Sequence, residues 1–186
     1  MDNTSKEYID FRERDYLFYG KHAKMVKDLV HSFDGGEKKL FQYNKDVYII
    51  APLVGFLYKR KAKSTSKKGE GTETPVTINA TQMLGMKEDI LFAYRLIILS
   101  DNRNEPDFLR RQDKAFREYF SEKSKDDEML FNEYVLGGVE ILHEKIIGDL
   151  KEESYVENLY DFLHDFELEF PLKENWSDEK VLELAK

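Results

Sequence analysis

The chain has 186 residues, enough to bury a core, and its 41% hydrophobic and 13% aromatic residues exclude a fully disordered protein. It has no cysteine, which excludes disulfides, thiolate zinc sites and a cysteine nucleophile. The net charge of −8 is uneven: residues 1–120 carry 22 Lys and Arg against 18 Asp and Glu, and residues 121–186 carry 7 against 19. The C-terminal part is therefore strongly acidic.

The N-terminal residues mix acids and bases and lack the apolar stretch of a signal peptide. The longest apolar run, residues 47–58, is 12 residues long, whereas a membrane helix needs about 20. We therefore expect a cytoplasmic protein with no membrane segment.

Apolar residues recur every three or four positions through most of the chain, which predicts helices. The first predicted helix covers residues 14–33, and a second begins at residue 47. Four more cover residues 81–99, 106–120, 128–147 and 154–166, and a short last helix follows Trp176-Ser177. Asp34-Gly35-Gly36 is a typical helix stop, and Thr77-Ile78 suits a brief extended segment.

The helix from Val47 is apolar on nearly every side as far as Lys59, so we expect it at the centre of the domain. Gly137-Gly138 interrupts another predicted helix, at a cost of roughly 1 kcal/mol per glycine relative to alanine. We therefore expect a neighbouring backbone to approach there, either within the fold or across a homodimer.

Residues 63–77 are polar and contain two glycines and a proline, so they predict a long exposed loop, a place to look for a functional role. Taken together, these segments predict an all-α fold: a compact single-domain bundle of six to seven helices with this one long polar loop. We expect the bundle over residues 1–170 and a C-terminal tail with a short helix over 171–186.

Two clusters of basic residues, called here the first and second basic sets, are candidates for contact with DNA or another anion. Their lysine and arginine side chains could neutralise phosphate groups. The first lies at a helix end and in the loop that follows: Lys59, Arg60, Lys61, Lys63, Lys67 and Lys68. The second lies on the predicted helix 106–120, opposite an apolar face of Phe108, Leu109 and Phe116: Arg110, Arg111, Lys114 and Arg117. The simpler interpretation is a pair of solvated faces, the second one paired with Asp113 and Glu118.

One pattern allows a metal centre. Glu140 and His143, and also Asp161 and His164, are carboxylate-x-x-His pairs, and the first matches the Glu-x-x-His element of di-iron bundles. An antiparallel hairpin would bring the two pairs level. However, their acidic neighbours at helical spacing indicate two outward polar faces rather than a metal core.

No motif of nucleophilic, phosphate-loop, dinucleotide or zinc-protease chemistry occurs in the sequence. His22 and His31 lack an acid–base partner by spacing. The aromatic stripe of residues 155–166, which includes Tyr155, Tyr160 and Phe162, fits a core better than a ligand cage, and no cofactor is expected.

Six short segments lie within residues 10–148: DVYIIA (46–51), GF (55–56), KRK (59–61), EDI (88–90), EY (133–134) and GGVEIL (137–142). Together these segments resemble small helical accessory proteins of bacterial DNA-phosphorothioation systems. The resemblance implies a bacterial cytoplasmic protein in DNA-modification-linked defence, and it carries over no catalytic residue.

These observations lead to three functional hypotheses. The first is a non-enzymatic helical interaction module that contacts a protein partner, with DNA as a second candidate partner. The second is a carboxylate/His metal enzyme built on Glu140, His143, Asp161 and His164. The third is an acidic inhibitor or immunity protein that binds a basic partner through the acidic C-terminal part.

Overall fold

The computed structural model describes residues 10–32, 38–64, 73–148 and 155–171. Seven α-helices lie in these ranges: α1 (Gly20–Leu29), α2 (Asn44–Leu57), α3 (Ala80–Gly85), α4 (Lys87–Ser100), α5 (Phe108–Phe116), α6 (Lys125–Leu142) and α7 (Tyr155–Glu169). The remaining elements are strands β1 (Tyr16–Phe18) and β2 (Val76–Ile78), short turns η1 (Phe11–Glu13) and η2 (Glu122–Ser124), and the π-helical turn η3 (His143–Ile147). The prediction of an all-α bundle is confirmed.

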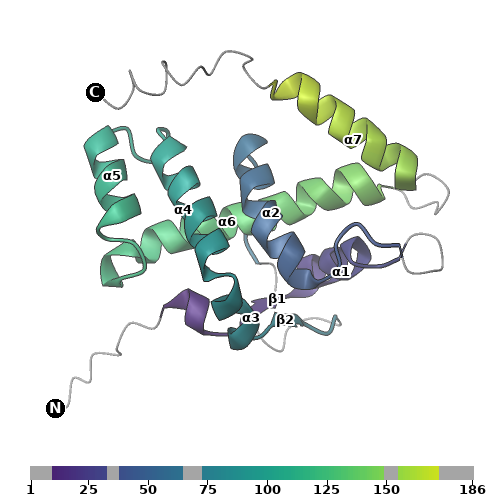
Figure 1. The fold of residues 1–186 in the computed structure, drawn as a ribbon, viewed down its shortest axis with the longest axis horizontal. Helices are drawn as coiled ribbons and strands as arrows, with labels where there is room; N and C mark the ends of the chain where they lie inside the picture. Colours follow the sequence, from purple (N-terminus) through teal and green to yellow (C-terminus); the bar gives the residue numbers. More distant parts are fainter. Residues whose placement is uncertain (1–9, 33–37, 65–72, 149–154, 172–186) are drawn as a thin grey trace.

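Helix α6 is the axis of the bundle. Figure 1 shows it running along the molecule, with α2 and α4 crossing it. From Leu130 to Leu142 its buried residues cover almost every side, as expected for a helix with neighbours all around. It begins at Lys125 rather than at the predicted Glu128, because a first turn with three carboxylates complements the helix N-terminus.

Helices α2 and α6 cross at their glycines. A Cβ on Gly55 would lie 2.2 Å from the carbonyl oxygen of Tyr134, and one on Gly138 would lie 1.7 Å from that of Ala51. A Cβ on Gly137 would lie 2.0 Å from the carbonyl oxygen of Arg60, just after α2. The close backbone approach predicted at Gly137-Gly138 is confirmed, and it takes place within the fold.

The predicted helix over residues 14–33 is wrong in its first part. Tyr16–Phe18 form β1, which pairs antiparallel with β2, with Tyr16 opposite Ile78 and Phe18 opposite Val76. Helix α1 begins only at Gly20, whose φ of +51° suits glycine at the bend between strand and helix. The extended segment expected at Thr77-Ile78 is confirmed as part of β2, so the polar loop ends before Val76.

The predicted helix over residues 81–99 is two helices that meet at Met86, whose φ and ψ of −115° and 20° break the helical path. Asn79 begins α3 because its side chain accepts a hydrogen bond from the Gln82 N–H (2.9 Å), and the Gln82 side chain accepts one from the Asn79 N–H (3.2 Å). This reciprocal cap fixes the chain direction directly after β2.

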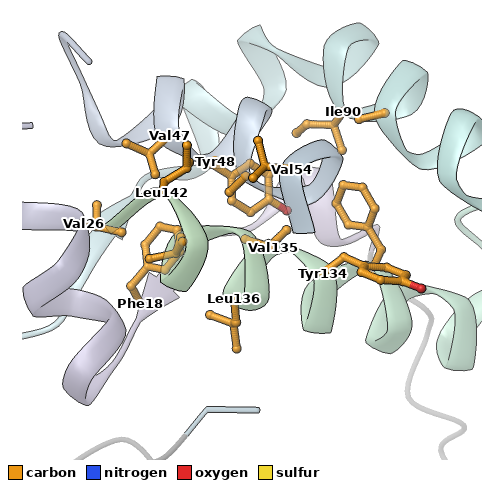
Figure 2. Close-up of a cluster of buried hydrophobic side chains, with 14 of the residues drawn as sticks. Phe18, Val26, Val47, Tyr48, Val54, Ile90, Tyr134, Val135, Leu136 and Leu142 are labelled. Atoms are coloured by element: carbon orange, nitrogen blue, oxygen red, sulfur yellow. The ribbon is translucent and has the colours of Figure 1, made fainter. Parts of the chain in front are cut away.

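One hydrophobic core joins the elements, from Phe18 of β1 to Phe162 of α7. Figure 2 shows its centre, where side chains of α1, β1, α2, α4 and α6 converge, including Val26, Tyr48, Ile90 and Val135. Helix α7 joins this core through Tyr58, whose ring contacts the rings of Phe162, Phe166 and Phe170. The short helix predicted in the tail 171–186 lies outside the described residues.

Candidate functional site

Three of the four described cations of the first basic set contact α6 or η3. The Arg60 guanidinium lies 3.1 Å from Glu144, and the Lys63 ammonium lies 3.7 Å from Glu133. Lys61 is held over the ring of Tyr134, with its Nζ atom 5.8 Å from the ring centroid. Lys59 lies two residues after the end of α2 and has a positive φ of 56°. Lys67 and Lys68 lie outside the described residues.

The outer cations of the second basic set form ion pairs within the chain. Arg110 makes two hydrogen bonds to the Glu118 carboxylate, at 3.1 and 3.3 Å, and Arg117 lies 2.7 Å from Asp113. The Glu118 hydrogen bonds raise the pKa of Arg110, and those same hydrogen bonds lower the pKa of Glu118. These are the two carboxylates that the simpler interpretation named as partners.

The inner cations of the set are structural. The Lys114 ammonium lies 3.0 Å from the buried carboxylate of Asp127 in the first turn of α6. Arg111 donates to three backbone carbonyls, those of Leu99 (2.8 Å), Glu105 (2.7 Å) and Pro106 (3.0 Å), which lie at and after the end of α4. They hold α5 against α4 and α6.

The two basic sets do not merge into one surface. The first set contacts α6 between Glu133 and Gly137, and the second contacts it at Asp127. Six to ten residues of α-helix separate these positions, which is about 9–15 Å along the axis. Together with the internal pairing, this separation weakens the case for a shared phosphate-binding surface.

Glu140 and His143, the first candidate metal pair, face α1. Glu140 Oε1 lies 2.6 Å from the Lys21 ammonium and 3.1 Å from His22 Nε2. His143 Nε2 lies 3.0 Å from the carboxylate of Asp28. Each helix thus supplies one histidine and one carboxylate, and the two pairs hold α1 on α6 and η3.

Asp161 and His164 lie exposed on α7, where His164 stacks on Tyr160 with parallel rings 6.2 Å apart. The described residues, which include all four candidate ligands, contain no group of three or more Asp, Glu or His side chains able to hold a metal ion. The geometry therefore gives no support to a metal centre at these residues.

The partner of His22 is one that sequence spacing could not find, because Glu140 lies 118 positions away. The imidazole is fully buried, and among the described residues its Nδ1 atom has no hydrogen-bond partner. Burial lowers the pKa of His22, although the hydrogen bond to Glu140 acts in the opposite direction. Burial raises the pKa of Glu140, but hydrogen bonds from Lys21 and His22 outweigh it, and the net pKa is lowered.

The apolar face predicted for the helix over 106–120 is exposed instead of buried. Helix α5 starts after its cap Asp107, which accepts from the Leu109 N–H at 2.8 Å, and it turns Ala115, Arg111 and Lys114 toward its neighbours. We call the exposed apolar side chains of these two neighbouring helices, α4 and α5, the α4–α5 surface. Its large apolar side chains are Phe92, Leu96, Phe108, Leu109 and Phe116, with exposed fractions of 44–69%.

Two arginines support this surface. Arg95 donates to the carbonyl of Ala115, and its guanidinium lies 5.0 Å from the centre of the Phe116 ring. The Arg111 guanidinium lies 5.4 Å from the centre of the Phe108 ring. Neither arginine forms an ion pair with a carboxylate among the residues that the structure describes. The α4–α5 surface is therefore both apolar and cationic.

Helix α7 carries a second exposed apolar stripe. It buries Tyr155 and Phe162 against the bundle, but Val156, Tyr160 and Leu163, which the sequence pattern places in the core, are 57–68% exposed. These three residues follow one another at helical spacing, so they form one line, which we call the α7 stripe. The helix contains five carboxylates and no lysine or arginine.

Comparison of the chain with protein-family models, curated proteins and solved structures finds no match. In the described part of the chain, no helix combines the length and the apolar composition that crossing a membrane would need. The functional argument therefore depends on the surfaces themselves.

Proposed function

We propose that the protein is a non-enzymatic interaction module and that the α4–α5 surface is its docking site for an acidic, amphipathic helix of a protein partner. The observation that carries the proposal is the exposure of five large apolar side chains on two neighbouring helices. Contiguous exposed apolar surface is typical of interaction sites. Here the local fold has turned it outward, since α5 uses its polar side to bind the bundle.

The chemistry of the surface defines the partner. Apolar side chains spaced three and four apart on a partner helix would cover Phe92, Leu109 and Phe116. Carboxylates beside them would meet Arg95 and Arg111, which have no carboxylate of their own among the described residues. Phenylalanine rings stacked on arginine are already ordered, which lowers the entropic cost of binding.

Protein binding has more support than DNA binding. Arg60, Lys63, Arg110, Lys114 and Arg117 all lie within 4 Å of a carboxylate of the same chain. A phosphate would have to compete with those partners before any counterion release contributes. Fluorescence anisotropy with duplex DNA at two salt concentrations tests this part, and absence of binding at low salt would remove DNA from the proposal.

The docking site is tested with two labelled synthetic helical peptides that carry leucine at positions i, i+4 and i+7. One peptide has glutamate at its flanking positions, and the other has lysine there. We expect the chain to bind the glutamate peptide and not the lysine peptide. Leu109→Asp should weaken that binding about tenfold or more, because it replaces an exposed apolar side chain of the surface with a negative charge that repels the glutamates of the peptide.

Leu84→Asp is the matched control, because Leu84 is an exposed leucine on α3, outside the α4–α5 surface. It should leave peptide binding unchanged. Equal affinity for the two peptides, or equal loss in both variants, would reject the α4–α5 surface as the docking site.

The association with DNA-phosphorothioation systems stays a prediction from the resemblance. Affinity capture from a lysate of the native host, with the wild type beside Leu109→Asp, tests it. Recovery of DNA-modification proteins by the wild type alone would support the association.

An inhibitor that binds a basic protein is the alternative, and α7 would be its acidic surface.

A further inference from the structure

The α7 stripe of this chain has the chemistry that the α4–α5 surface is proposed to bind. We propose that the α4–α5 surface of one copy binds the α7 stripe of a second copy, so that the chain assembles head to tail. The inference rests on the proposed function and names its partner as another copy of this chain. Each surface alone is an uncovered apolar face, and the pair is complementary in charge and length.

Charge complementarity is the first argument. Helix α7 contains five carboxylates and no lysine or arginine. At helical spacing, Glu157 and Glu167 are the carboxylates that border the α7 stripe, whereas Asp165 and Glu169 face Tyr58. Beside the apolar side chains of the α4–α5 surface lie the guanidinium groups of Arg95 and Arg111, which have only carbonyl and ring partners among the described residues. Contact between the two faces would give these arginines carboxylate partners in an interface that excludes water.

The dimensions of the two faces also agree. On α7, Val156 and Leu163 are seven residues apart, and on α5, Leu109 and Phe116 are also seven residues apart. Seven residues of α-helix span about 10.5 Å. The whole of α7 has 15 residues and α4 has 14, so one helix can lie along the other over nearly its full length.

The positions of the two faces decide the type of assembly. Figure 1 shows α5 and α7 toward opposite ends of the longest axis of the molecule. A copy can therefore use its α4–α5 surface and its α7 stripe at the same time. Such a contact joins different surfaces of the two copies, so it produces open chains, or a ring if the rotation closes.

The test uses two variants of the full chain, each with one face disabled: Leu109→Asp in the α4–α5 surface and Leu163→Asp in the α7 stripe. Both leucines are exposed, so both variants should retain the wild-type helical circular dichroism. Light scattering during size exclusion should show wild-type mass rising with concentration, while each variant alone remains at the mass of one chain. Leu84→Asp should assemble as the wild type does.

Mixing the two variants gives the decisive measurement. Leu109→Asp retains its α7 stripe and Leu163→Asp retains its α4–α5 surface, so the mixture should form a 1:1 complex of twice the mass of one chain and nothing larger. A wild type that stays monomeric at all concentrations, or a mixture without complex, would overturn the inference. If the glutamate peptide still binds in that case, the docking site survives and only its assignment to a second copy fails.

Discussion

Gly138 lies so close to Ala51 that a Cβ on Gly138 would stand 1.7 Å from the Ala51 carbonyl oxygen. The obstructing atom belongs to the backbone of α2 and cannot rotate away. Gly138→Ala therefore forces α2 and α6 apart, and we expect a loss of about 3 kcal/mol or more in the free energy of unfolding. Urea denaturation followed by circular dichroism measures it.

Gly85→Ala is the control for that prediction. Apart from its chain neighbours and the local helical backbone, no atom of the described residues lies within 4 Å of a Cβ at Gly85, which is the last residue of α3. We expect no loss and a gain of up to about 1 kcal/mol, since alanine has the higher helix propensity. Equal effects of the two substitutions would show that the crossing does not depend on glycine.

Tyr134 should stabilise the junction of α4 and α6 through its hydroxyl group. The hydroxyl donates to the buried carboxylate of Asp101 at 2.7 Å, and the N–H of Asn104 donates to the other oxygen at 3.2 Å. Tyr134→Phe removes the shorter bond, so we expect a loss of about 1–3 kcal/mol.

A double-mutant cycle with Asp101→Asn separates this bond from packing effects. If the bond contributes as expected, the double variant loses less than the sum of the single variants. Strict additivity would contradict the prediction.

Lys114→Met should destabilise the protein, because it leaves the carboxylate of Asp127 without its nearest cation. The Asp127 side chain is only 5% exposed, whereas an exposed pair would lose little. We expect a loss of about 1–3 kcal/mol, less than for a fully buried pair, because the N-terminus of α6 still favours the carboxylate.

Lys125→Met is the matched control, because the Lys125–Glu122 pair is more than half exposed on both sides. Its effect should lie within about 0.5 kcal/mol of zero. Chemical denaturation of both variants at one pH and salt concentration makes the comparison. A larger loss of unfolding free energy in Lys125→Met than in Lys114→Met would contradict the stabilising role of the Lys114–Asp127 pair.

The stability of the fold should decrease when the pH falls below about 6.5, the ordinary pKa of histidine. Burial places the pKa of His22 below that value in the folded state. The unfolded chain therefore binds more protons than the folded one. The contribution of His22 to the free energy of unfolding is fully present above pH 6.5 and is lost as the pH falls through the pKa of His22 in the folded state. The slope from this residue is at most about 1.4 kcal/mol per pH unit.

His22→Gln keeps a side-chain N–H that can donate to Glu140 but does not titrate. Denaturation at pH 7.5 and pH 5.5 should show a smaller difference for this variant than for the wild type. His164→Gln is the control, since His164 is exposed on α7 and should leave the difference unchanged. An unchanged difference in His22→Gln would assign the pH dependence to other groups.

Much of the helical content could be predicted from the sequence. The predicted helices correspond to α2, α6 and α7 because their apolar residues recur at helical spacing along each segment. The close approach at Gly137-Gly138 was also predictable, since glycine within a helix is costly unless a neighbour needs the space.

Pairing over long sequence distances could not be predicted. Tyr16–Phe18 looks like the start of a helix until Val76–Ile78 is placed beside it, about 60 residues later. The same holds for His22 and Glu140, which belong to separate helices and meet only because α1 packs on α6. No local spacing carries that information.

Local sequence by itself therefore determined which segments form helices, because a helix is built from contacts between residues three and four apart. The tertiary structure decided which face of each helix is covered. Phe116 and Leu163 have the pattern of core residues, yet both are exposed, because α5 is held by Arg111 and Lys114 and α7 docks through Tyr155 and Phe162. Burial depends on the neighbours that the whole fold supplies, and for this reason the candidate docking surfaces became visible only in three dimensions.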